Sequence, residues 1–400
     1  MQFFLLVGIG FLALCRANDA TATFQQLCQE NGFKSEQHSV TTQDGYILTL
    51  FRIPGFLNDT SSAPKQPLLM HHGLIDSSDT WVVNSPSLAP GFVMAAKGYD
   101  VWLGNSRGNK YSLGHLTLST SSKAYWAFTW QHFAQYDIPA DINFILSMTG
   151  FPKLTYMGHS QGTLVMFALL SSQPEWADKL TTFVAVGPVA TVRNLTSSIV
   201  QYVADSSVFG LLEDAGVYDF LPNPDTPTLY YLFCKVLKDV CNVGVEIVAD
   251  LEVKNVDNLP RFPTILAHEP GGTSILNMQH WTQMAQYPAY FMQRFDYGTT
   301  ENLQVYGQAT PPKFDLSQIR APIAAYFGIY DELADPIDGQ WLRGQLTANA
   351  NLPGLHIVDD LLFGHLTFMW GLDVSYLDDV QNWVEKWTVG NAPQSLLRTS

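Results

Sequence analysis

Residues 158–162 read GHSQG, a G-x-S-x-G pattern. The short apolar run 154–157 precedes this pentapeptide, and the longer apolar run 163–171 follows it. A strand, this pattern and a helix in succession are typical of the nucleophile elbow, a sharp turn that exposes a serine hydroxyl. The pentapeptide alone occurs by chance, but its flanking segments favour an elbow with Ser160 as the nucleophile.

Patterns of strand and helix alternate on both sides of the elbow. A hairpin is predicted over 40–53 with Asp44-Gly45 as its turn, and a helix over 137–150 with Asp137 as its N-cap. Further strands are predicted at 67–71, 99–103, 154–157, 183–186, 322–328 and 355–358, and further helices at 163–171 and 374–387. This alternation predicts an α/β fold, a mostly parallel sheet with helices on both faces.

The alternation stops from about residue 191 to residue 316. This stretch has many aromatic residues, prolines and short helix-like pieces such as 229–240. The simplest interpretation is one α/β core that is interrupted by an inserted, mainly helical cap.

Composition limits the function classes. The chain has 400 residues, of which 46% are hydrophobic and 14% charged, so it can bury a large core. Its formal net charge of −15 repels phosphate backbones, which argues against nucleic acid as a partner.

The N-terminal residues are typical of a secretory signal. Residues 3–14 form a short apolar run, and small residues near position 17 fit cleavage after residues 1–17. No other apolar stretch is long enough to cross a membrane, so the mature chain is predicted to have no transmembrane segment. Asn58 and Asn194 begin glycosylation sequons, which also indicates secretion.

Three cysteines would remain after cleavage. Cys234 and Cys241 are close enough in sequence to close a small loop in an oxidising compartment, which would leave Cys28 free. Three buried thiols are the alternative. No second Cys/His pair lies at ligand spacing, so no metal site is predicted.

An oxyanion needs two aligned backbone N–H donors. One donor is expected from Gln161, the residue after the nucleophile, and the other from the loop after an early strand. His71-His72-Gly73-Leu74 follows such a strand, with Leu74 as the expected donor. The His71 and His72 side chains are expected only to pack the turn.

The remaining triad members should follow Ser160 in the order acid, then histidine. Asp331 comes nearest the end of the strand 322–328, whereas Asp335 precedes a proline and is better suited to capping the next helix. His365 lies on a loop after the last strand, whereas His356 lies inside that strand. The sequence thus predicts Ser160 as nucleophile, Asp331 as orienter and His365 as base, with no metal or organic cofactor.

Nearly the whole chain, from about residue 32 to 387, resembles the acid lipase family, which includes gastric lipase and lysosomal acid lipase. The resemblance is carried by TTQDGYILTLFRIP, HHGLIDSSDTW, GYDVWLGNSRGNKYS, YWAFTW, YDIPADINFIL, YMGHSQGT, VAVGPVA, GGTSILNMQHW, DELADP and GHLTFMWGLD. It implies an α/β-hydrolase core of residues 18–190 and 317–400, and a cap with a lid over residues 191–316.

The same resemblance implies roles for individual residues. Ser160, Asp331 and His365 fall on the family triad, and Leu74 and Gln161 on its oxyanion hole. Cys234 and Cys241 lie where the family has a cap disulfide, although their spacing here is shorter. The family usually has Asp two residues after the base, whereas this chain has Thr367, so the hydrogen bonding near His365 is expected to differ.

Two further groups carry open interpretations. Arg107 in GNSRGN is expected to tie loops together rather than to contact substrate. Aromatic residues of the predicted cap either line an acyl pocket or simply pack the cap: Trp281, Tyr287, Tyr290, Phe291 and Phe295.

The expected function is hydrolysis of carboxylic esters of lipids, triacylglycerols or sterol esters, at a lipid–water interface. The expected location is the secretory pathway, with an extracellular or lysosomal destination. An esterase for smaller soluble esters and a non-catalytic lipid-binding protein on the same scaffold are the alternatives. The intact triad and oxyanion loops argue against the latter.

Overall fold

The computed structural model describes residues 19–195, 208–221 and 256–393. The predicted signal peptide, the predicted helix 229–240, and both Cys234 and Cys241 lie outside the described residues.

Within these described residues, the core is one nine-stranded sheet. Its strands run in the spatial order β1 (Glu36–Thr41), β2 (Tyr46–Ile53), β4 (Asp100–Gly104), β3 (Pro67–His71), β6 (Leu154–His159), β7 (Leu180–Val186), β10 (Ile323–Gly328) and β11 (Leu355–Leu361), while β5 (Gly114–His115) pairs with β2. Pairing is antiparallel from β1 to β4 and parallel from β4 to β11. The predicted mostly parallel sheet is confirmed.

Helices cover both faces of this sheet. On one face pack α3 (Trp130–His132), α4 (Ile138–Thr149), α5 (Gln161–Ser172) and α13 (Pro336–Ala348); on the other pack α1 (Phe24–Glu30), α2 (Pro90–Ala96), α14 (Thr367–Trp370) and α15 (Tyr376–Thr388). Neighbouring strand residues serve opposite faces, as Tyr156 and Met157 of β6 show. Because both faces are covered, the central strands are buried along their whole length.

The predicted core elements occur with their ends shifted by no more than three residues, except that the hairpin's first strand starts at Glu36. One local prediction is wrong: Asp137 makes no side-chain cap to α4. It ends the π-helical turn η3 (Phe133–Asp137), and its carboxylate binds the Arg107 guanidinium instead, with Oδ1 2.8 Å from Nε. A buried cation competes more strongly for this carboxylate than the first-turn amides of a helix.

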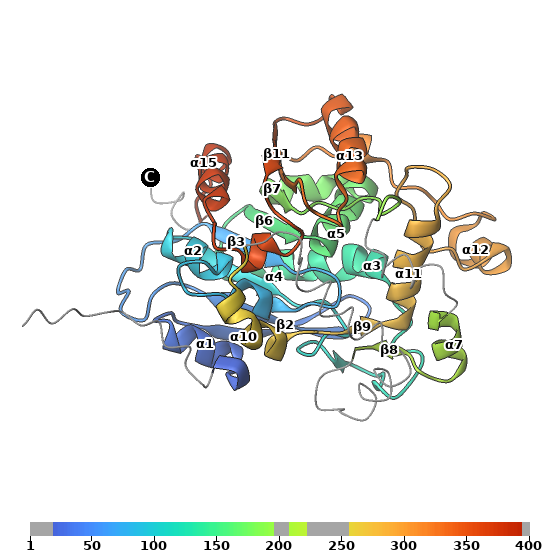
Figure 1. Ribbon diagram of the computed structural model, residues 1–400, viewed down its shortest axis with the longest axis horizontal. Helices are drawn as coiled ribbons and strands as arrows, with labels where there is room; N and C mark the ends of the chain where they lie inside the picture. The colour runs from blue at the N-terminus through green and yellow to red at the C-terminus, as the bar shows by residue number, and fades with distance from the viewer. Residues whose placement is uncertain (1–18, 196–207, 222–255, 394–400) are drawn as a thin grey trace, which may run out of the picture.

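Between β7 and β10 the chain leaves the sheet. The described part of this stretch contains α7 (Val208–Asp214), β8 (Asp219–Phe220), η5 (Leu259–Arg261), α10 (Phe262–His268), β9 (Thr273–Ser274), α11 (Ile275–Gln286) and α12 (Thr299–Tyr306). In Figure 1 the gold and orange segments of this stretch lie outside the central sheet. Within the described residues, no helix has both the length and the apolar character needed to cross a bilayer.

Candidate active site

Ser160 lies in a strained turn between β6 and α5. Its backbone has φ 52° and ψ −118°, a conformation that L-residues rarely adopt. The flanking glycines are required by sterics. A Cβ at Gly158 would lie 2.7 Å from the backbone of Gly162, and a Cβ at Gly162 would clash with the carbonyl oxygen of His71. The predicted elbow conformation is therefore present, and strand β3 packs closely against it.

Asp331 and His365 form a buried hydrogen-bonded pair. Asp331 follows β10 and His365 follows β11, so two adjacent parallel strands deliver them to the same edge of the sheet. His365 Nδ1 and Asp331 Oδ2 are 2.8 Å apart, and the two residues are 3% and 2% exposed. Asp331 Oδ1 accepts the backbone N–H groups of Leu333 and Ala334, which fixes the carboxylate plane.

The competing candidates have other partners. Asp335 caps α13 by accepting the N–H of Ile337 at 2.8 Å, as predicted. His356 sits in β11 and contacts Asp379 of α15, with Nε2 2.6 Å from Oδ2. Neither side chain is available to the pair that Asp331 and His365 make.

His159, which the sequence did not single out, connects His365 to the elbow. Its Nε2–H donates to the carbonyl oxygen of His365 at 2.9 Å, and the two ring centroids are 4.8 Å apart. Burial, and then the charge of His365, lower the pKa of His159 to about 3, so its ring is a neutral donor. Gly187, which directly follows β7, also lies close to the His365 ring, because a Cβ at Gly187 would be 3.4 Å from it. The His365 loop is thus packed directly against the residues that flank Ser160.

Thr367 also holds the loop that carries His365. Its fully buried hydroxyl accepts the N–H of Gly364 at 3.2 Å and donates to the carboxyl group of Asp257. Burial raises the pKa of Asp257 to about 6, against the opposing effect of the Thr367 hydrogen bond. Thr367 thus ties the His365 loop to Asp257, a partner that no sequence pattern indicated.

The predicted oxyanion loop lies beside Ser160. A Cβ at Gly73 would be 3.3 Å from the Cβ of Ser160, so the backbone leading to Leu74 runs along this serine. Helix α5 begins at Gln161, so the N–H of Gln161 has no acceptor inside the helix and lies at its positive end. Both predicted donors therefore belong to segments that meet at Ser160.

The His72 side chain serves the loop structurally, as predicted. Its Nδ1–H donates to the carbonyl oxygen of Gly73 at 2.8 Å, and its Nε2 accepts the N–H of Ser106 at 3.1 Å. Burial lowers the pKa of His72, which keeps the ring neutral. The ring thus fixes the start of the predicted oxyanion loop through these two hydrogen bonds.

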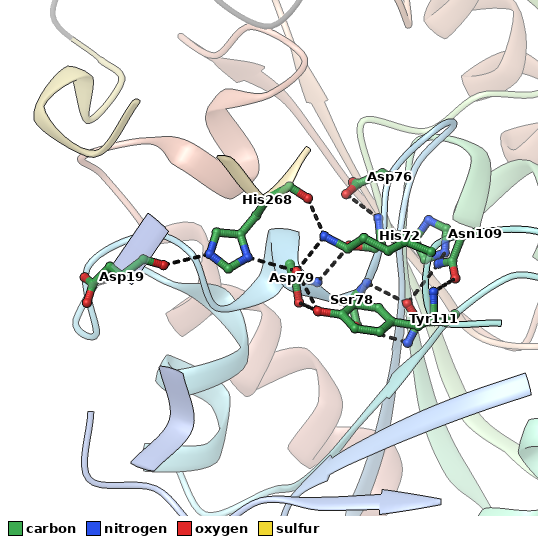
Figure 2. Close-up of polar contacts among 11 residues, drawn as sticks. Asp19, His72, Asp76, Ser78, Asp79, Asn109, Tyr111 and His268 are labelled. Carbon is green, nitrogen blue, oxygen red and sulfur yellow. Dashed lines mark hydrogen bonds and ion pairs between the residues drawn. The ribbon is translucent and has the colours of Figure 1, made fainter. Parts of the chain in front are cut away.

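A polar cluster around Asp79 anchors the end of this loop (Figure 2). Asp79 lies in η2 (Ser78–Trp81) and is fully buried; it accepts hydrogen bonds from Lys110 Nζ at 2.7 Å and Tyr111 Oη at 2.9 Å, and it contacts His268 Nδ1 at 3.0 Å. His268 Nε2 in turn contacts the carbonyl oxygen of Asp19 at 2.8 Å. Burial alone would raise the pKa of Asp79, but His268 and Lys110 outweigh it and hold that pKa below its usual value. The cluster joins the N-terminal segment, α10 and η2.

The structure also describes Arg107, Cys28 and the two predicted glycosylation sites, Asn58 and Asn194. Arg107 is buried and bound by Asp44 and Asp137, so its predicted role in tying loops together is confirmed. Cys28 is a buried free thiol. Asn58 is exposed, whereas the Asn194 amide donates to Asp338 Oδ1 at 2.7 Å.

The aromatic residues of the predicted cap also differ from one another. Trp281 Nε1–H donates to the Gln161 side chain at 2.8 Å, while Tyr287 is buried and stacks on Phe291. Tyr290 is exposed. Asn277, which was not predicted to matter, also binds Gln161, at 2.9 Å.

The chain matches two family models. A partial alpha/beta-hydrolase lipase region covers residues 24–85, and an alpha/beta hydrolase fold covers residues 66–372. Among curated proteins, it is 37% identical to the gastric triacylglycerol lipase of Rattus norvegicus, with 89% of each chain covered. It is 38% identical to the human lysosomal acid lipase/cholesteryl ester hydrolase, with 86% of each covered.

Solved structures with distant sequences share the fold of this chain. A soluble variant of monoglyceride lipase from Saccharomyces cerevisiae superimposes with a TM-score of 0.52 at 12% identity, covering 87% of this chain and 94% of that one, which supports the fold alone. The sequence relatives and family models go further: this chain belongs to the acid lipase family of α/β-hydrolases, the family of gastric and lysosomal acid lipases.

Proposed function

We propose that this protein hydrolyses carboxylic esters of lipids through an acyl-enzyme, with Ser160 as nucleophile, His365 as base and Asp331 as orienter. The observation that carries the proposal is the buried Asp331–His365 hydrogen bond, whose imidazole packs against the strained Ser160 elbow. Relatives named triacylglycerol lipase and cholesteryl ester hydrolase support the lipid ester as substrate.

The chemistry follows from the arrangement. His365 takes the proton of the Ser160 hydroxyl as the oxygen attacks the ester carbonyl, and Asp331 stabilises the imidazolium that forms. The N–H groups of Leu74 and Gln161 hold the oxyanion. The imidazolium then protonates the leaving alcohol, and water, activated by the same imidazole, releases the fatty acid from the acyl-enzyme.

We further assign residues 191–316 to a cap with a lid that meets the lipid–water interface, a division supported by the loss of strand–helix alternation. A disulfide between Cys234 and Cys241 would stabilise it. An apolar N-terminus with a signal pattern and the exposed sequon at Asn58 support passage through the secretory pathway, to the extracellular fluid or the lysosome. Asn194 is proposed as the second glycosylation site, although its amide would have to leave Asp338.

Hydrolysis assays test this function. The wild type, Ser160→Ala and the control Ser172→Ala would be compared on triacylglycerol, cholesteryl ester and p-nitrophenyl butyrate from pH 4 to 8. Ser172 lies at the far end of α5, where its hydroxyl donates to the backbone carbonyls of Ala168 and Leu169. We expect Ser160→Ala to lose activity on the lipid substrates and Ser172→Ala to keep it. Turnover by Ser160→Ala equal to that of the wild type would refute Ser160 as the nucleophile. Turnover of the short ester alone would favour an esterase for soluble esters. Lipid binding without turnover would favour a non-catalytic binding protein.

A further inference from the structure

Two side chains of helix α11 hold the side chain of Gln161. Gln161 is 2% exposed, and its Oε1 accepts two hydrogen bonds, from Asn277 Nδ2 at 2.9 Å and from Trp281 Nε1 at 2.8 Å. Asn277 and Trp281 are four residues apart, on one face of α11. Two donors of one helix therefore converge on a single oxygen of the residue that follows the nucleophile.

The Asn277 amide is itself fixed in orientation. Its Oδ1 accepts the backbone N–H of Trp130 at 2.7 Å, so its NH₂ group must face Gln161 and the hydroxyl of Thr273. Asn277 is fully buried, and its own N–H is accepted by the N-cap Ser274. The donor is therefore preorganised by contacts with the core and cannot easily turn away.

The residues just before α11 contact the loop that carries Leu74, the other predicted oxyanion donor. The N–H groups of Gly271 and Gly272 both donate to the carbonyl oxygen of Ile75, at 2.6 and 3.3 Å. Ile75 directly follows Leu74 and has φ 54°, an unfavourable conformation for a β-branched residue. Such strain persists only when surrounding contacts over-determine it. Gly271 is suited to this close approach, because a Cβ there would clash with the backbone of Asp76.

We propose that the segment 271–281 positions both backbone donors of the oxyanion hole, with Asn277 and Trp281 acting as positioning residues through the Gln161 side chain. The inference rests on the proposed function. An oxyanion-hole donor acts only when it is aimed at the place where negative charge develops. Anchoring the Gln161 side chain restricts rotation of the peptide that carries its N–H. The segment would thereby set the rate of the chemical step, in addition to any effect on substrate access.

Loss of this anchor should lower kcat rather than raise KM. Removing a complete oxyanion donor reduces kcat about 10²–10³-fold. Loosening a donor that remains present should cost less, and we expect a decrease of roughly 10-fold for each anchor. Because the effect is confined to the transition state, KM for a short ester should stay within about twofold.

Two variants and a matched control test the inference. Trp281→Phe removes the indole donor and keeps an aromatic ring, and Asn277→Asp places an acceptor opposite Gln161 Oε1 while it still binds the Trp130 N–H. The control is Trp383→Phe, which deletes the indole hydrogen bond to Thr182 Oγ1, 2.8 Å long. Thr182 lies near the start of β7, whereas the Ser160 N–H bonds Val186 at the end of that strand. Values of kcat and KM would be measured with p-nitrophenyl butyrate, counting active sites by phosphonate titration and checking Tm.

A double-mutant cycle separates positioning from general destabilisation. Gln161→Leu keeps the backbone N–H and removes the oxygen that both donors bind. In that background, Trp281→Phe should change kcat less than about twofold, because its acceptor is already gone. In the wild-type Gln161 background, by contrast, Trp281→Phe should show its full decrease in kcat.

The outcomes distinguish this inference from the proposed function. Positioning is supported if Trp281→Phe or Asn277→Asp lowers kcat and leaves KM unchanged. The same substitution must then cause no such decrease in the Gln161→Leu background. Values of kcat within twofold of the wild type in both folded variants, or losses that add fully in the cycle, would overturn it. If at the same time Ser160→Ala is inactive, the proposed function stands and only the positioning role fails. An active Ser160→Ala would instead remove the proposed function itself.

Discussion

Replacing Asp331 with Asn reverses the proton arrangement of the proposed base with almost no change of shape. Asp331 Oδ1 faces two backbone N–H groups, of Leu333 and Ala334, at 3.0 and 2.6 Å. In Asp331→Asn only the amide oxygen can occupy this position, because an NH₂ group would oppose two donors. The NH₂ group is therefore directed at Nδ1 of His365. The imidazole must then accept there and carry its proton on Nε2, the nitrogen that should accept the Ser160 proton.

The magnitude follows from this wrong tautomer. The corresponding loss in a serine protease triad is about 10⁴-fold in kcat, on the order of 5 kcal/mol of transition-state stabilisation. We expect a loss of similar size here, since the pair is buried and no solvent can exchange its partners. The assay is kcat for p-nitrophenyl butyrate at several pH values, with circular dichroism to confirm that the variant folds.

Asp335→Asn is the matched control. It makes the same chemical change four residues away, at the N-cap of α13, where an amide oxygen can still accept the Ile337 N–H. We expect this variant to keep kcat within a few-fold. If folded Asp331→Asn retained activity within tenfold of the wild type, or if both variants lost activity equally, the assignment of Asp331 would be refuted.

Three further predictions concern packing, the buried cluster and pH. Gly162→Ala should abolish activity and lower the free energy of unfolding by about 1–3 kcal/mol or more, because the new methyl group meets the His71 backbone; thermal melts and kcat check this. Asp79→Ala should destabilise by about 3–5 kcal/mol, because it leaves the buried Lys110 ammonium without its carboxylate, and urea unfolding measures the loss; a loss below 1 kcal/mol would contradict it. Asp257 has its pKa raised by burial to about 6 in the folded state, so the folded protein binds more protons than the unfolded chain between about pH 4 and 6. Its contribution to stability is therefore present at low pH and lost as pH rises through this window, by at most about 3 kcal/mol. Asp257→Asn should remove that loss, matching the wild type near pH 4 and exceeding it at pH 7 in Tm.

Much of this molecule could be predicted from its sequence because local and global signals agree. The buried parallel strands are continuous apolar runs, and the chain order of nucleophile, acid and base fixes which strand ends to search. The preference for Asp331 over Asp335 followed from the proline after Asp335, and the helix that this aspartate caps has that proline at its start.

The remaining contacts join segments that are distant in sequence, so no local pattern indicates them. The hydrogen bond of His159 to the His365 backbone spans 206 positions. Asn277 reaches Gln161 across 116 positions, so this contact depends on where α11 lies in the folded protein. Asp137 was predicted wrongly for the same reason: its position fits an N-cap, but a guanidinium 30 residues earlier in the chain is the stronger partner.

Covalent labelling can identify the nucleophilic residue itself. A p-nitrophenyl alkylphosphonate presents a tetrahedral phosphorus to an activated serine, and peptide mass mapping locates the adduct. We expect one adduct per chain, on Ser160, formed in step with the loss of ester hydrolysis and at a greatly reduced rate in Asp331→Asn. Complete inactivation with Ser160 unmodified, or undiminished hydrolysis after Ser160 has been fully modified, would contradict it.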